Sequence, residues 1–171
     1  MQKEKQTIIK NAIMYASKVM GIEPDIFEVV FAHESQMPNK EVFATSDRKT
    51  YVIYFNSEMV EERDYQEITI TAFHETRHLY QVMVVEFSSK MNLTSYEKKI
   101  LKDWKRCLQN PVIPEGNEKE DTEYLNQSTE IDAIAFTYYL MNKLTNVKPI
   151  IPESIKEKVL IVANELQKQY N

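Results

Sequence analysis

The residues most able to do chemistry are His74, Glu75 and His78, in the segment His74-Glu75-Thr76-Arg77-His78. Residues four apart lie on one face of an α-helix, so the two imidazoles are expected to be close enough to bind one metal ion. Zinc suits such a pair because it accepts nitrogen and oxygen ligands in tetrahedral geometry. Only three histidines occur in the 171 residues, which makes a chance match to this pattern rare. The spacing therefore predicts one Zn²⁺ per chain.

Glu75 directly follows the first of these histidines. In helices with the pattern HExxH, this carboxylate is a general base toward water and then passes the proton to the leaving amine. The metal in such sites lowers the pKa of water toward neutrality and polarises the carbonyl that is attacked. The pattern therefore predicts a zinc-dependent peptidase with Glu75 as the catalytic residue.

A catalytic zinc needs a third protein ligand. The only other histidine, His33, lies upstream at the end of an expected strand, so a carboxylate from a later helix is the better candidate. Glu130 opens the nearly apolar segment 130–136, where a carboxylate is costly unless it is paired or bound to metal. Asp132 is the alternative, since two residues are roughly 200° apart on a helix and only one of them can face the metal squarely. The other one would support a ligand or pair with a cation.

Two further side chains could contribute to the site. Arg77 is roughly 100° around the helix from His78, and either faces solvent or pairs with Asp132 or Glu130. Tyr138 is two turns after Glu130, so it shares that face and could donate a hydrogen bond to a tetrahedral intermediate. Packing in the core or at an interface is the alternative role for Tyr138.

The elements before the motif are expected to be one helix and three short strands. Apolar residues at helical spacing predict a helix over 1–21, with a glycine as its stop. β-Branched and aromatic residues predict strands over 26–31, 41–46 and 50–56. The polar stretch between the last two strands predicts a hairpin, and the sheet is expected to be small and antiparallel or mixed.

Four helices are expected from the motif onward. The first has Asp64 as its N-cap and contains the motif, and the second begins with a capping box, Thr94-Ser95-Tyr96-Glu97. A polar loop at 110–122 contains two prolines and a glycine and is a candidate lid. The four helical ranges are 64–88, 94–109, 122–144 (which carries Glu130) and 153–170. The fold class is therefore expected to be α+β.

Composition narrows the class of protein. The length fits one domain over 1–171, and the two distant glycines exclude a Gly-rich phosphate loop. A net charge of −5 argues against a nucleic-acid partner. The chain has no apolar run of about 20 residues, and its single cysteine cannot form an internal disulfide. No apolar segment follows the first lysines, so we expect no signal peptide. We therefore expect a cytoplasmic protein with no membrane partner.

The two motif segments together resemble a known family. His74-Glu75-Thr76-Arg77-His78, followed by Glu130-Ile131-Asp132-Ala133-Ile134-Ala135-Phe136, resembles the minimal gluzincin-like metallopeptidases and is closest to the ImmA/IrrE type. The resemblance implies a minimal zincin fold, zinc bound by His74, His78 and Glu130, Glu75 as the catalytic base, and a proteolytic activity, which in several relatives is directed at a regulatory protein. The sequence departs from the family pattern at Arg77, where zincins usually have an uncharged residue, and at Asp132, where glutamate is commoner.

Two other functions compete with the peptidase. A zincin-like module could bind zinc and a regulatory partner without physiological protease activity, or the chain could be a metal-free helical interaction domain. The expected partner of the peptidase is a protein or peptide substrate. The sequence contains no pattern that specifies the substrate, the cleavage site or the oligomeric state.

Overall fold

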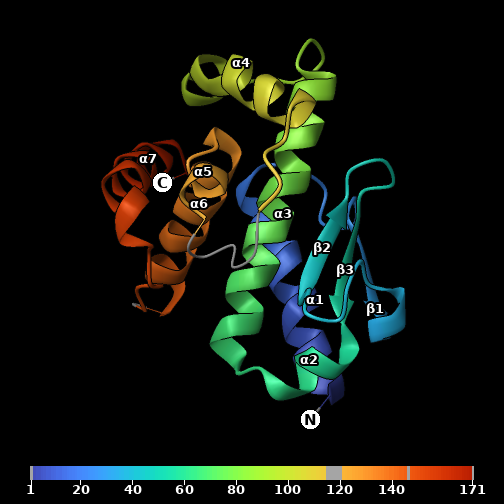
Figure 1. Cartoon of the computed structure of the whole chain (residues 1–171). Helices are drawn as coiled ribbons and strands as arrows, with labels where there is room; N and C mark the ends of the chain where they lie inside the picture. The colour runs from blue at the N-terminus through green and yellow to red at the C-terminus, as the bar shows by residue number, and fades with distance from the viewer. Residues whose placement is uncertain (1, 115–120, 146, 171) are drawn as a thin grey trace. The chain divides into compact units, whose positions relative to one another are not determined.

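The computed structural model describes residues 2–114, 121–145 and 147–170 (Figure 1). These residues form seven α-helices, two 3-10 helices and a three-stranded sheet, which confirms the α+β class. The chain divides into two compact units, Met1–Leu79 and Tyr80–Asn171. The division falls within helix α3 (Tyr65–Phe87). A single domain over 1–171 stays a prediction.

The first unit begins with helix α1 (Gln2–Val19). The helix ends at Val19, shortly before the expected stop at Gly21, whose φ of 71° is the left-handed conformation that glycine adopts without steric cost. The ring of Tyr15 on α1 packs against Phe73 of α3 at 6.5 Å between ring centroids. The Nζ atom of Lys10 lies 5.9 Å from the centre of the Phe31 ring in the first strand. Helix α1 therefore contacts both the sheet and the helix that carries the motif.

The sheet consists of β1 (Glu28–Ala32), β2 (Ala44–Asp47) and β3 (Val52–Asn56), in the order β1-β3-β2 (Figure 1). Strands β2 and β3 pair antiparallel, which confirms the predicted hairpin. Strand β1 pairs parallel with β3, so the sheet is mixed and the antiparallel alternative is wrong. The parallel pairing arises because β2 lies between β1 and β3 in the chain, so that two reversals of direction separate them.

The turn of the hairpin is closed by local hydrogen bonds to Asp47. Its carboxylate accepts a hydrogen bond from the Lys49 amide at 2.9 Å and another from the Thr50 hydroxyl at 2.7 Å. These two bonds, the one from Lys49 first, hold the pKa of the Asp47 carboxyl below its ordinary value. Tyr51 has a φ of 58°, and its ring stacks on Phe27 at 6.3 Å.

A short helix that the sequence did not predict, α2 (Ser57–Glu62), connects the sheet to the motif helix. The buried side chain of Asn56, the last residue of β3, caps it by accepting hydrogen bonds from the amides of Glu58 and Met59. Asp64 then caps α3 as predicted, accepting from the amides two and three residues later at 2.8 Å each. Capping therefore determines where the motif helix begins.

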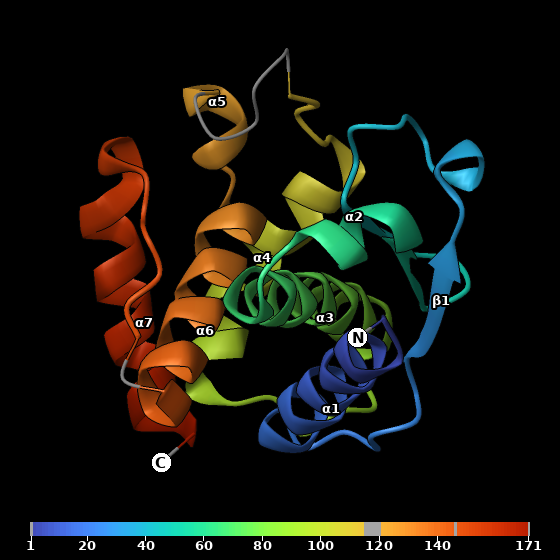
Figure 2. The same cartoon turned by 90° about the horizontal axis from the view of Figure 1, so that it is seen from below.

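The second unit contains the end of α3 and four further α-helices. Helices α6 and α7 lie side by side in Figures 1 and 2, and the ring of Tyr170 contacts Phe136 at 6.0 Å and Tyr139 at 6.3 Å. The elements after α3 are α4 (Ser95–Gln109), α5 (Thr122–Leu125), α6 (Ser128–Thr145), the 3-10 helix η2 (Glu153–Ile155) and α7 (Lys156–Tyr170).

The structure differs from the prediction of one helix over 122–144, because the chain breaks between α5 and α6. At the break, the Gln127 amide oxygen accepts from the Val112 backbone amide at 2.9 Å, and its nitrogen donates to the Val112 carbonyl at 3.1 Å. This pair of bonds ties the start of α6 to the loop after α4. The predicted lid over 110–122 falls partly on residues 115–120, which lie outside the described residues.

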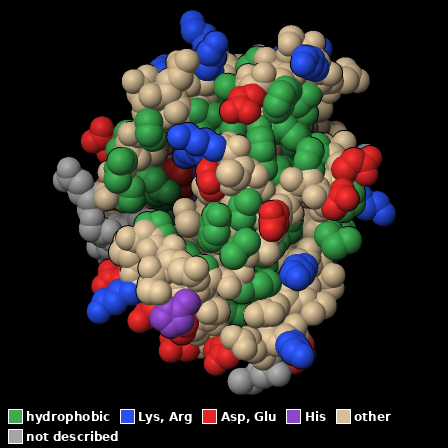
Figure 3. All heavy atoms as spheres, turned by 90° about the vertical axis from the view of Figure 1, so that its right-hand side faces the viewer, with side chains coloured by type: hydrophobic (Ala, Val, Ile, Leu, Met, Phe, Trp, Pro, Cys, Tyr) green, Lys and Arg blue, Asp and Glu red, His purple; other side chains and the backbone are tan. Residues whose placement is uncertain are grey.

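Exposed side chains of different kinds are mixed on the face drawn in Figure 3. Acidic, basic and hydrophobic groups alternate there over short distances. In the described part of the chain, no helix has the length and apolar character that crossing a membrane requires.

Candidate metal centre

The two histidines of the motif point to the same place on α3. Their Nε2 atoms lie 2.9 Å apart, and the rings are nearly perpendicular, with centroids 4.5 Å apart. His78 is only 9% exposed, whereas His74 is half-buried. The helix therefore places two imidazole nitrogens side by side, as the four-residue spacing predicted.

Glu130 completes a group that could hold a metal ion. It lies in the first turn of α6 and is 5% exposed. One ligand atom from each of His74, His78 and Glu130 lies within 4.8 Å of the other two. A buried carboxylate is costly unless it is paired or bound to metal, so its place beside two imidazoles is what a metal site requires.

The spacing of the two histidine nitrogens is close to that of two ligands on one tetrahedral metal ion. At bond lengths of about 2.0–2.1 Å, ligands of tetrahedral zinc are roughly 3.3 Å apart. The 2.9 Å between the histidine nitrogens is close to that value and needs a shift of only a few tenths of an ångström. Two imidazoles and one carboxylate are also the donor set of several catalytic zinc sites, in which the fourth position stays open.

Asp132, the alternative ligand, has other partners. It is completely buried, and its Oδ2 accepts a hydrogen bond from Gln81 Nε2 at 2.8 Å. Its Oδ1 accepts one from the Tyr96 hydroxyl, also at 2.8 Å. Each carboxylate oxygen of Asp132 therefore accepts a hydrogen bond from a side chain of another helix.

Arg77 is completely buried, so the prediction that it could face solvent is wrong. The reason is that every residue of α3 from 76 to 84 is buried, and the helix has no solvent-facing side there. A helix that is buried all round places even its polar residues in the interior.

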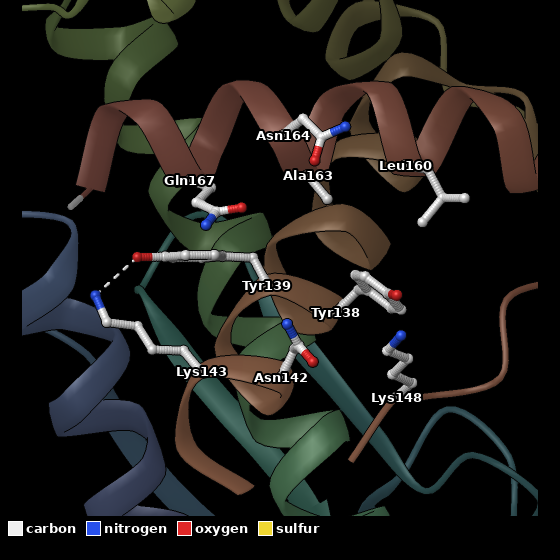
Figure 4. Close-up of a pocket in the computed structure, with 9 residues that line it drawn as sticks. All are labelled: Tyr138, Tyr139, Asn142, Lys143, Lys148, Leu160, Ala163, Asn164 and Gln167. Atoms are coloured by element: carbon white, nitrogen blue, oxygen red, sulfur yellow. Dashed lines mark hydrogen bonds between the residues drawn. The ribbon is translucent and has the colours of Figure 1, made fainter. Parts of the chain in front are cut away.

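Glu75 is half-buried beside the two histidines, so its carboxylate is not sealed from solvent. Tyr138 lines a pocket of about 280 Å³ between α6 and α7, together with Asn142 and Asn164 (Figure 4). Figure 4 also shows the Lys143 Nζ atom donating to the Tyr139 hydroxyl at 2.9 Å, a bond between two residues of α6 that line this pocket. Support of a transition state by Tyr138 stays a prediction.

His33, the third histidine, has a different role. It caps the 3-10 helix η1 (Glu34–Gln36), accepting a hydrogen bond from the Ser35 amide at 3.2 Å. Its Nε2 atom lies 3.3 Å from a carboxylate oxygen of Glu58. Together with hydrogen bonds from backbone and side-chain donors, led by the Glu58 backbone amide, this histidine lowers the pKa of the Glu58 carboxyl.

One polar residue near the site was missed in the sequence. Tyr96 lies in the capping box of α4, where its spacing gave no sign of a bond to Asp132. Gln81 carried a signal, because it lies seven residues after His74 and so on nearly the same face of α3.

Comparison with family models, curated proteins and solved structures finds no match to this chain. The group of His74, His78 and Glu130, which could hold a metal ion, is therefore the structural basis for a statement about function.

Proposed function

We propose that this protein is a zinc-dependent peptidase of the minimal gluzincin type, nearest to ImmA/IrrE. The observation that carries the proposal is the group formed by His74, His78 and Glu130, with Glu75 beside it on the same helix. Nitrogen and oxygen donors in this number favour zinc over calcium or magnesium, which prefer oxygen ligands alone.

Each residue then has a chemical task. His74, His78 and Glu130 hold the ion, which when bound acts as a Lewis acid and lowers the pKa of water. Glu75 takes a proton from the attacking water and passes it to the leaving amine. Its half-buried position suits this task, because the carboxylate must reach both solvent and substrate.

An extended peptide is the substrate class that the sheet favours. Strand β2 is at one edge of the sheet and, among the described residues, pairs only with β3. A hollow of about 330 Å³ lies beside it, lined by Met37, Thr45 and Asp47 among others. Edge strands bind peptides by adding a strand through main-chain hydrogen bonds, with neighbouring hollows receiving side chains.

The first test is metal content and peptide cleavage of wild type, His78→Ala and Glu75→Gln, all purified without an affinity metal. We expect one zinc per chain in wild type, loss of zinc in His78→Ala, and retained zinc without cleavage in Glu75→Gln. Wild-type protein that stays metal-free after resupply of zinc would exclude the proposal. Cleavage by Glu75→Gln at the wild-type rate would exclude the peptidase.

A zinc-binding regulatory module without protease activity is the second candidate. The observation that favours it is the complete burial of Arg77, a permanent cation one residue before a proposed ligand. This candidate predicts a zinc-loaded wild type that cleaves no member of a broad peptide library. Cleavage that disappears in Glu75→Gln would exclude it.

A further inference from the structure

The side chain of Gln81 holds the first turn of α6 on both sides of Glu130. Gln81 is completely buried on α3. Its Nε2 atom donates to the backbone carbonyl of Thr129 at 2.9 Å and to Asp132 Oδ2 at 2.8 Å. An amide nitrogen has two protons, so both are used, one on each side of the proposed ligand.

Asp132 extends this contact to a third helix. Its other oxygen, Oδ1, accepts from the hydroxyl of Tyr96 on α4 at 2.8 Å. Buried hydrogen-bonded networks of this kind are rigid, because each member that loses its partner is left with a large desolvation cost. The chain Gln81–Asp132–Tyr96 therefore restrains the helical turn that carries Glu130.

The position of Gln81 on its own helix relates it to the other two ligands. It lies three residues after His78 and seven after His74, and α3 is one continuous helix through all three residues. Seven residues are nearly two full turns, so Gln81 and His74 share a face. Helix α3 thus carries two of the proposed ligands, His74 and His78. It also carries Gln81, whose side chain binds α6 on either side of the third proposed ligand, Glu130.

We infer that Gln81 is a positioning residue for the metal site, and that it acts through Thr129 and Asp132 on the placement of Glu130. This inference rests on the proposed metal-binding function. Groups that orient metal ligands typically change metal affinity by 10–100-fold when they are removed. The mechanism here is preorganisation: without the two bonds, α6 must be brought into position when the ion binds.

If Gln81 had a purely structural role, its replacement would lower the stability of the folded protein without a specific effect on zinc affinity. Tyr80→Phe is a matched control for that case. Tyr80 is the preceding residue on α3, is 3% exposed, and donates a buried hydrogen bond to Glu97 on α4. Removing its hydroxyl breaks a hydrogen bond between α3 and α4 in which no residue of the Glu130 turn takes part.

The test compares wild type, Gln81→Met, Tyr96→Phe and Tyr80→Phe by two readouts. The first is the zinc dissociation constant, measured by competition with a chromophoric chelator, and the second is the melting temperature of the metal-free protein. Methionine keeps the volume of glutamine and removes both donors. We expect Gln81→Met to weaken zinc binding 10–100-fold, Tyr96→Phe to weaken it by less than tenfold, and Tyr80→Phe to leave it unchanged.

Wild-type zinc affinity in Gln81→Met would overturn the inference and leave the metal site intact. Equal weakening in Tyr80→Phe would overturn it as well, because the effect would then be general. If Gln81→Met does not fold, the zinc affinity of Tyr96→Phe decides. Weaker zinc binding in Tyr96→Phe than in wild type supports the inference, and wild-type affinity overturns it. If the wild type itself does not bind zinc, the proposed function is wrong. That result is distinguishable from a failure of the Gln81 inference alone, in which the wild type still binds zinc.

Discussion

Glu130 and Asp132 are two residues apart on α6, both are buried, and their surroundings differ. Asp132 accepts hydrogen bonds from Gln81 and Tyr96, whereas Glu130 offers an oxygen to the group formed with the two histidines. Because the turn of a helix separates their directions by roughly 200°, the two carboxylates serve different partners. At the residue scale, the neighbours rather than the residue type assign each role.

This difference predicts unequal effects of neutralising the two carboxylates. Glu130→Gln should lose stoichiometric zinc, because an amide replaces the one charged ligand. Asp132→Asn should retain zinc with about tenfold weaker binding, as expected for a group that supports a ligand. Elemental analysis measures the zinc content of the two variants, and chelator competition measures their zinc affinity. Loss of zinc in Asp132→Asn but not in Glu130→Gln would reverse the assignment.

At the scale of elements, α4 shows how a local signal in the sequence becomes a tertiary contact. The Thr94 hydroxyl accepts from the Glu97 amide at 3.2 Å, and the Glu97 carboxylate accepts from the Thr94 amide at 2.8 Å. This is the predicted capping box. The same hydroxyl also donates to the side chain of Gln169 on α7 at 2.9 Å, which no local pattern indicated.

Replacing Thr94 by alanine should therefore destabilise the protein by about 1 kcal/mol, the usual cost of a lost N-cap. Urea unfolding followed by circular dichroism measures the change. Ser95→Ala is a suitable control, because the Ser95 side chain is exposed at the first position of the same helix. Thr94→Ser, which keeps the hydroxyl, should recover most of the loss. Equal stability of Thr94→Ala and wild type would contradict the capping role.

For the whole molecule, metal binding and stability should be linked. The proposed ligands come from α3 and α6, which are far apart in the sequence, so the unfolded chain does not present the site. A ligand that binds only the folded state stabilises it by about 2.7 kcal/mol at 100 times its dissociation constant.

We therefore expect zinc to raise the melting temperature of wild type by roughly 5–10 °C at that concentration, given about 2–4 °C per kcal/mol for a chain of this size. Differential scanning calorimetry with and without a chelator measures the shift. His78→Ala should show none. A wild type that binds zinc but melts at the same temperature after chelation would show that the folded state has no preference for the ion.

The sequence by itself determined the features that depend on neighbouring residues. These include the helix over the motif with its Asp64 cap, the β2–β3 hairpin, the capping box of α4 and the shared face of His74 and His78. Each follows from periodicity or from hydrogen bonds between residues within a few positions of each other, and such interactions form wherever the local pattern occurs.

Only the tertiary structure decided the features that depend on contacts between segments far apart in the sequence. The parallel pairing of β1 with β3 and the burial of Arg77 both arise from contacts between residues far apart in the chain. Likewise, only the fold shows that Gln81 and Tyr96 donate hydrogen bonds to the two oxygens of Asp132, while Glu130 lies with the two histidines. A pattern of residues records which side chains share a face, but the partner of that face is set by packing between elements.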